Sequence, residues 1–183
     1  MIKGGIGGGS TLTGLHFENE RDLLKLLASK KGYEIKDEKI GKAVYFENKL
    51  VANIYRKHDL YKFLTLKNID WKAKISKKLL PDDALYVIIN NTLYIIELKF
   101  QNVAGSVDEK LQTCDFKKKQ YQKLLSELNV EVQYIYVLSD WFKKPEYKDV
   151  LDYIISVNCE YYFDYIPLQK LGLPVPEDAL IEN

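Results

Sequence analysis

Two short runs of β-branched and aromatic residues in the middle of the chain predict a pair of strands. Leu85–Ile89 and Leu93–Leu98 are apolar at nearly every position, which is typical of strands that are buried on both faces. Asn90 and Asn91 join them, and Asn tolerates the positive φ angles that a two-residue hairpin turn needs. We therefore expect a β-hairpin at the centre of a covered sheet.

Apolar residues at helical spacing predict a helix on each side of this hairpin. Before it, apolar residues recur every three or four positions over residues 17–31, and Gly32 ends the pattern. After it, Ser106 and Glu109 form a capping-box pattern at the start of an amphipathic stretch that runs over residues 106–128. Both stretches are expected to pack on the sheet.

A further strand sets the direction of the sheet. Val132–Leu138 alternates β-branched and aromatic residues, and a strand, a crossover helix and a strand imply a parallel, right-handed connection. We also expect helical structure over much of residues 56–71 and around 149–155. The predicted fold class is α/β, with a mixed central β-sheet flanked by helices in the order helix, two or three strands, helix, strand.

Length and composition point to one globular domain. The chain has 183 residues, of which 46% are apolar and 29% charged, so a disordered class is excluded. We divide the expected domain into a Gly-rich N-terminal arm over residues 1–14, a core over 15–138 and a helical, Tyr-rich extension over 139–183. No apolar run approaches the ~20 residues of a membrane helix, and the cytoplasm is the expected compartment.

Neither the cysteines nor the glycines indicate a cofactor. Cys114 and Cys159 lack the spacing of a disulfide framework or a zinc site, so both are expected to be buried free thiols. The glycine-rich stretch within residues 4–9 lacks the Lys-Ser/Thr ending of a phosphate-binding loop. A DNA-contacting arm and a tail without a partner remain open for it.

Charge is distributed unevenly along the chain, although the formal net charge is only +1. Residues 56–78 contain eight lysines and arginines against two aspartates, whereas residues 145–183 contain eight acids against two lysines. Such polarity favours one cationic face toward a DNA backbone. Two solvated helix faces explain it equally well.

The candidate chemistry lies at the ends of the predicted hairpin. Glu97 and Lys99 are separated by one residue, so on a strand they point to the same face. The backbone carbonyl of Leu98 lies between them. Acid-x-Lys occurs eight times in the chain, but only this pair ends an apolar strand whose partner begins with Pro81-Asp82. Two carboxylates, a carbonyl and an ammonium are the groups that bind Mg²⁺ and assist phosphodiester hydrolysis.

This arrangement resembles the signature of the PD-(D/E)XK nuclease superfamily, with its restriction-endonuclease-like αβββαβ core, and most closely a small type II restriction endonuclease. The resemblance implies a sequence-specific, Mg²⁺-dependent endonuclease that cuts double-stranded DNA, in which Asp82 and Glu97 bind the metal and Lys99 assists the attacking water. It further implies that Glu18 on the first helix supports the site. A homodimer and a cognate DNA methyltransferase in the same system are the expected partners.

Several basic and polar residues near the site are candidates for contacting DNA. Lys77 and Lys78 directly precede Pro81-Asp82, and Gln101 and Lys110 follow the second strand. Groups placed beside a cleavage point position the phosphate backbone. The run Lys117–Lys119 fits either a phosphate contact or a solvated helix face.

Two other functions fit the same residues, namely a structure-specific nuclease such as a Holliday-junction resolvase and a catalytically silent nuclease fold that binds DNA. The register of the hairpin gives a sharper expectation. With a two-residue turn at Asn90-Asn91, Asp82 faces Lys99 and shares a face with Glu97. Asp83 then points to the other face, so Asp82 is the expected metal ligand.

Overall fold

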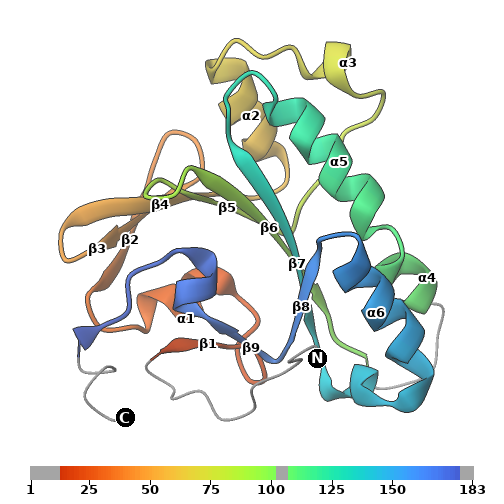
Figure 1. The fold of residues 1–183 in the computed structure, drawn as a ribbon. Helices are drawn as coiled ribbons and strands as arrows, with labels where there is room; N and C mark the ends of the chain where they lie inside the picture. The colour runs from red at the N-terminus through yellow and green to blue at the C-terminus, as the bar shows by residue number, and fades with distance from the viewer. Residues whose placement is uncertain (1–12, 102–106, 178–183) are drawn as a thin grey trace.

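The structure is a computed structural model that describes residues 13–101 and 107–177. Within these residues, a large mixed sheet and a separate two-stranded sheet form the centre of the fold (Figure 1). The strands of the large sheet are β2 (Tyr33–Asp37), β3 (Lys42–Phe46), β4 (Lys49–Tyr55), β5 (Asp83–Val87), β6 (Thr92–Lys99), β7 (Glu131–Leu138) and β8 (Glu160–Phe163), and the small sheet pairs β1 (Gly14–His16) with β9 (Tyr165–Pro167).

The large sheet is mixed, as the sequence predicted. Its order is β2-β3-β4-β5-β6-β7-β8. Neighbours from β2 to β6 are antiparallel, whereas β7 is parallel to β6 and β8 is parallel to β7. The predicted hairpin strands β5 and β6 lie inside the sheet, where apolar residues on both faces are buried.

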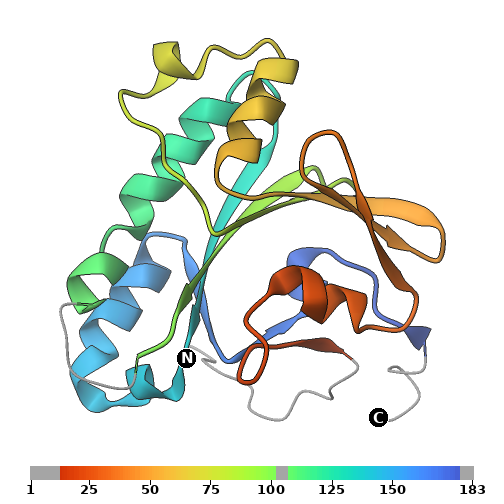
Figure 2. The same cartoon turned by 180° about the vertical axis from the view of Figure 1, so that it is seen from behind.

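Helices cover one face of the sheet. Figures 1 and 2 show α2, α5 and α6 on the same side, with α3 and α4 at the ends of that layer. Apolar residues of these helices, such as Leu64, Leu124 and Ile154, pack with Ile95 and Tyr134 of the sheet in one buried cluster. The helices are α1 (Leu23–Ala28), α2 (His58–Leu66), α3 (Trp71–Lys74), α4 (Val107–Leu111), α5 (Cys114–Leu125) and α6 (Lys148–Ser156), and the short 3₁₀ helices are η1 (Asp140–Lys143), η2 (Pro145–Tyr147) and η3 (Leu168–Leu171).

Both ends of the described chain cover the other face. In Figure 1, α1 and the small sheet lie within the curve of the large sheet. Phe17, Leu27 and Ile166 from these segments are fully buried against Ile96 and Ile135 of the large sheet. The sheet is therefore covered on both faces, and its β5–β6 centre is shielded from solvent.

The hairpin has a longer connection than the sequence predicted. Residues Ile88–Asn91 form a four-residue turn, and the last pair before it is Val87–Thr92. Asn91 takes the positive φ, at 52°. The expected pairing is thus displaced by two residues, and Asp83 lies opposite Ile96. Because side chains alternate with a period of two, this displacement leaves every side chain on the face that was predicted.

The first helix is shorter than predicted. Residues 17–22 are not helical, and α1 begins only at Leu23, after the N-cap residue Asp22. The physical reason is long-range pairing, since β1 bonds to β9 and the Phe17 amide donates to the carbonyl of Asp164 at 2.7 Å. The local apolar spacing could not reveal that partner, and tertiary pairing overrides helical periodicity here.

The stretch predicted as one helix over residues 106–128 forms two, α4 and α5. The Thr113 hydroxyl donates to the Lys110 carbonyl at 2.7 Å in the break between them. Ser106 of the predicted capping box lies outside the described residues, as does the glycine-rich stretch within residues 4–9. The helix expected over 56–71 is present as α2 followed by α3, and the one expected around 149–155 as α6.

Cys114 and Cys159 are free and buried, as predicted. Among the described residues no helix has the length and apolar character needed to cross a membrane.

Candidate active site

The candidate site lies where β6 leaves the sheet. Glu97 and Lys99 point to the helix-covered face, because they share parity with Ile95, which packs in the helical cluster. Only 7% of Glu97 is exposed. The Nζ atom of Lys99 lies 3.1 Å from Glu97 Oε2, so the predicted acid and lysine form an ion pair.

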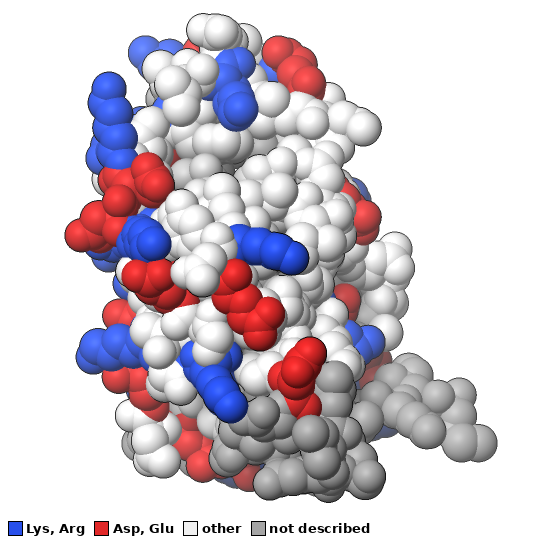
Figure 3. All heavy atoms as spheres, turned by 90° about the vertical axis from the view of Figure 1, so that its left-hand side faces the viewer, with Lys and Arg blue, Asp and Glu red and all other residues white. Residues whose placement is uncertain are grey.

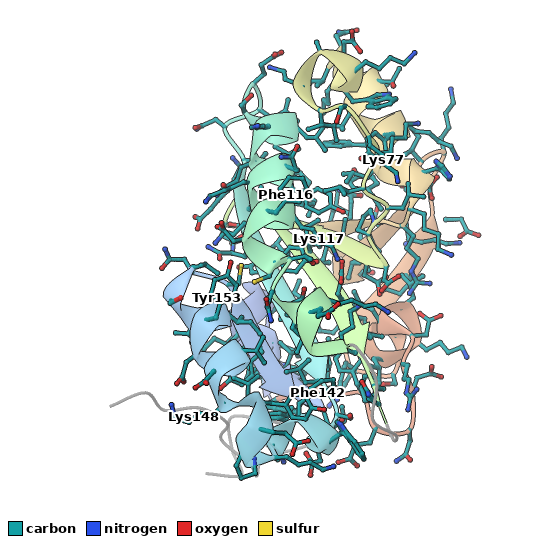
Figure 4. The ribbon with its side chains drawn as sticks, turned by 90° about the vertical axis from the view of Figure 1, so that its right-hand side faces the viewer. Lys77, Phe116, Lys117, Phe142, Lys148 and Tyr153 are labelled. Atoms are coloured by element: carbon teal, nitrogen blue, oxygen red, sulfur yellow. The ribbon has the colours of Figure 1, made fainter. Side chains whose placement is uncertain are left out.

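A second lysine reaches the same carboxylate from α5. The Nζ atom of Lys117 donates to Glu97 Oε1 at 2.7 Å and to Oε2 at 3.0 Å. Figure 4 shows Lys117 on the side of α5 that faces the segment leading into β5. Burial alone would raise the pKa of Glu97, but Lys99 and Lys117 outweigh it and hold that pKa below its usual value. Glu97 is therefore a carboxylate between two ammonium groups.

Two buried tyrosines complete the wall of the site. The Tyr134 hydroxyl is fully buried and makes no hydrogen bond of normal geometry with the described residues. Burial and then the charge of Glu97 raise the pKa of Tyr134 well above its usual range. Tyr121 lies one turn after Lys117 on α5, and its pKa is also raised, by burial and then by charges that include Glu97 and Asp82. Both hydroxyls thus stay protonated beside Glu97.

Asp82 stands across from Glu97. It is exposed, in the bend that directly precedes β5. Since Asp83 pairs with Ile96, extending the ladder by one position places Asp82 opposite Glu97. The effect of both acids on Tyr121 is consistent with this position. By alternation from Asp83, this position puts Asp82 on the face of Glu97 and Lys99.

Asp83 serves a different purpose on the opposite face. It is 3% exposed and accepts a hydrogen bond from Arg56 Nε at 2.6 Å. Arg56 also donates to Asp22 Oδ1 at 2.7 Å, and Asp22 in turn caps α1 by accepting from the Leu24 amide at 2.9 Å. Burial raises the pKa of Asp83 despite the opposing effect of Arg56. This cluster fastens α1 to β5.

The donor atoms fit a hard divalent cation in type. The backbone carbonyl of Lys99 accepts from Ser139 on the β7 side, so in an extended strand the Leu98 carbonyl points the other way, toward β5. The ladder with β5 ends at Asp83–Ile96, so the Leu98 carbonyl lies two residues beyond the last paired position, where the same register puts Pro81. Two carboxylates and one carbonyl supply only oxygen, and Mg²⁺ bound in this manner keeps several waters.

The described residues contain no group of three or more His, Cys, Asp and Glu side chains arranged to hold a metal ion. Two acids, not three, converge at this site. A cation here also has to share Glu97 with Lys99 and Lys117. The oxygen ligands of the site therefore fit Mg²⁺ in type, with water completing the ligand set. A metal ion that binds Glu97 would compete there with the ammonium groups of Lys99 and Lys117.

The four residues expected to contact DNA lie around the site in different settings. Lys77 is exposed on the segment between α3 and β5 and is seen on the same side as Lys117 in Figure 4. Lys78 is directed at aromatic rings instead, with its Nζ 4.8 Å from the centroids of both Tyr61 and Trp71. Gln101 bonds to Ser139 through its backbone amide at 3.2 Å.

Lys110 is exposed on α4. Its backbone carbonyl accepts from the Tyr136 hydroxyl at 3.2 Å, which ties α4 to β7. Lys110 is thus fixed in place by its backbone while its ammonium is left at the surface.

Glu18 is not brought to Glu97. It is exposed, precedes α1, and acts electrostatically on Asp164. Burial, a hydrogen bond with Asp140 and charges that include Glu18 raise the pKa of Asp164 to about 6. The family resemblance implied that an acid on the first helix, here Glu18, supports the metal site. In the structure Glu18 precedes that helix.

The charged segments lie apart in the fold. The basic segment 56–78 includes α2 and α3, and the acidic segment includes α6, at opposite ends of the helical layer in Figure 1. On the side seen in Figure 3, by contrast, basic and acidic side chains are interspersed.

Sequence reasoning missed Lys117 as a partner of Glu97. The only sequence signal was its position in a lysine run, one helical turn before Tyr121. The partner of Asp83 was missed as well, because Arg56 lies 27 residues away in sequence.

The chain was compared with models of known families, with curated proteins and with solved structures, and none of the three comparisons gave a match.

Proposed function

We propose that this protein is a Mg²⁺-dependent endonuclease that hydrolyses phosphodiester bonds of double-stranded DNA. The observation that carries the proposal is the ion pair of Glu97 and Lys99 at the end of β6, beside the strand β5 that Asp82 directly precedes. Burying a carboxylate and an ammonium lowers the stability of the fold unless the two charges are paired with each other or bound to a ligand.

The order of elements supports the proposal. From α1 the chain continues through the antiparallel strands β4, β5 and β6, the helix α5 and the parallel strand β7. This order agrees with an αβββαβ nuclease core, to which the hairpin β2–β3 and the strands β8 and β9 are additions. The agreement is one of topology and of three side chains.

The chain's own residues define the chemistry we propose. Asp82, Glu97 and the Leu98 carbonyl would hold the metal, which supplies charge neutralisation at the phosphate and lowers the pKa of a bound water. Lys99 is held at 3.1 Å from Glu97, where its ammonium would orient the attacking water and stabilise the charge that develops on phosphate oxygens. Tyr121 and Tyr134 are buried, and we propose that they limit the access of bulk water to Glu97.

Lys77, Lys110 and Gln101 would position the DNA backbone beside this site. We further propose sequence-specific cleavage by a homodimer, as in a type II restriction system with a cognate methyltransferase, because a single small site cuts one strand at a time.

The test of the proposal is cleavage of duplex DNA by the purified protein. We expect discrete fragments from a long duplex with Mg²⁺ and none with a chelator or with Lys99→Met. Fragments that persist in chelator contradict metal dependence. A folded protein that cuts neither duplex nor branched DNA contradicts the nuclease assignment.

One observation favours a second candidate, a nuclease fold that binds DNA without cutting it. Both oxygens of Glu97 are paired with lysines, a state that needs no metal. In that case the protein binds duplex DNA with an affinity that falls as the salt concentration rises. Mg²⁺ then changes neither this affinity nor the length of the DNA. A structure-specific nuclease is recognised in the same assay by preference for a branched substrate.

A further inference from the structure

Lys117 has no part in the proposed reaction, yet it makes the closest contacts to Glu97. Its Nζ lies 2.7 Å from Oε1 and 3.0 Å from Oε2, compared with 3.1 Å between Lys99 and Oε2. Lys117 thus contacts both carboxylate oxygens and lies closest to Oε1, whereas the closest contact of Lys99 is to Oε2.

The other two lysines of the run on α5 show that this contact is specific to one position. Lys118 is 8% exposed and donates to the carbonyl of Asn158, on the side of α6 and β8. Lys119 is exposed and pairs with Asp115 on its own helix at 2.7 Å. Of the three lysines, Lys117 is the one that bonds to Glu97.

Charge repulsion disfavours this contact once a metal is bound at Glu97. Glu97 carries one negative charge between two ammonium groups, and a divalent cation brought to the same carboxylate meets both at close range in a partly buried site. At least one ammonium has to move away. Lys99 follows Glu97 by two residues on the same strand, so its range is limited, whereas Lys117 reaches in from a helix on a flexible stem and its side chain is 26% exposed.

We propose that Lys117 occupies the metal position at Glu97 in the metal-free protein and is displaced when a divalent cation binds. This inference rests on the proposed function, because it assumes that Glu97 is a metal ligand. While the site lacks metal, Lys117 keeps a buried carboxylate paired and stabilises the fold. The same pairing lowers metal affinity, since only molecules in which Lys117 has left Glu97 are competent to bind.

Lys117→Met tests the proposal, because it removes the charge and keeps most of the apolar stem. Calorimetric titration with Mn²⁺, without DNA, is expected to give a dissociation constant about tenfold or more lower than that of the wild type. This factor corresponds to a wild-type protein in which Lys117 has left Glu97 in less than about a tenth of the molecules. Thermal unfolding without metal should occur at a lower temperature. Lys119→Met, the matched control on the same helix, should change neither quantity.

The other possible outcomes of the Mn²⁺ titration separate the displacement of Lys117 from the proposed endonuclease function. Equal or weaker Mn²⁺ binding by folded Lys117→Met overturns the displacement and leaves the endonuclease proposal intact. No Mn²⁺ binding by any variant overturns both. Should Lys117→Met fail to fold, Lys117→Arg decides, because it keeps a cation at Glu97. It must bind Mn²⁺ no more tightly than the wild type, and tighter binding overturns the proposal.

Discussion

Asp82 and Asp83 are neighbours in sequence with opposite environments. Asp82 is exposed on the face of Glu97, whereas Asp83 is 3% exposed on the other face and bonded to Arg56. Alternation along the strand produces this difference. Either aspartate satisfies the sequence pattern, and only the face to which each one points separates a metal ligand from a structural anchor.

Asparagine substitution at the two positions is predicted to separate cleavage from stability. Asp82→Asn should reduce cleavage ~100-fold or more, the scale of losing one charge-stabilising group, while the unfolding temperature stays near that of the wild type. Asp83→Asn should lower stability by less than the ~3–5 kcal/mol lost on breaking a fully buried pair, because burial outweighs Arg56 at the Asp83 carboxyl and a third of the Arg56 side chain is exposed.

Both variants are measured by cleavage rate at a temperature where each is folded and by thermal unfolding. A stable Asp83→Asn protein that does not cleave, beside an active Asp82→Asn protein, would show that the faces are assigned wrongly.

At the scale of elements, the strands were more predictable than the helices and the turn. The buried runs of β5, β6 and β7 carry their own signal, because apolar residues on both faces need a central position. The turn between β5 and β6 is two residues longer than predicted, yet Asp83 lies on the face opposite Glu97 and Lys99 as predicted, since an even displacement preserves alternation.

The elements that sequence could not reveal depend on distant partners. Residues 14–16 gave no strand signal of their own and pair with β9 about 150 residues later. Likewise, β8 in the Tyr-rich tail becomes a strand by pairing with β7. At the candidate site, Lys117 depends on the packing of α5 against β7. Periodicity describes one element at a time and is silent on such pairings.

The junction of β8 and β9 is predicted to make stability depend on pH. The folded-state pKa of Asp164 is about 6, above its usual value of 3.8, and its φ is 52°. Because its pKa is raised on folding, Asp164 contributes to stability in its protonated form. This contribution is complete below the pKa of the unfolded chain and is lost as pH rises through about 6.

Asp164→Asn stays neutral and tolerates the positive φ. We therefore expect its unfolding temperature to exceed that of the wild type above pH 6 and to approach it near pH 4. The difference between the two proteins, followed across this range, removes the effect of other titrating groups. A difference that does not vary with pH would mean that Asp164 is not the group responsible.

For the whole molecule, the arrangement of charge suggests how DNA would approach. The basic segment with α2 and α3 and the acidic segment with α6 lie at opposite ends of the helical layer, with Lys117 between them on α5 (Figure 4). A phosphate backbone would be attracted at one end and repelled at the other. Approach from the α2–α3 side brings the duplex to Asp82 and Glu97.

Double-strand cleavage is predicted to require two copies of the chain. One site cuts one strand, and two sites related by a twofold axis match a palindromic duplex. Sedimentation with a duplex that the protein cuts, in Ca²⁺ to slow the reaction, should show two protein chains per DNA. A species with one chain per duplex that still cuts both strands at once would contradict this prediction.

The pairing of β1 with β9 has a consequence during synthesis. The Thr13 side chain bonds to Tyr165, 152 residues later, so the first strand waits for almost the whole chain to be translated, roughly 8–30 s at ordinary elongation rates. Until then Ile135 and Val137 lack the segment around Ile166 that packs in the same cluster. Nascent chains of this protein would therefore expose the part of this apolar sheet face that the C-terminal segment covers, where a chaperone that binds hydrophobic segments has time to act.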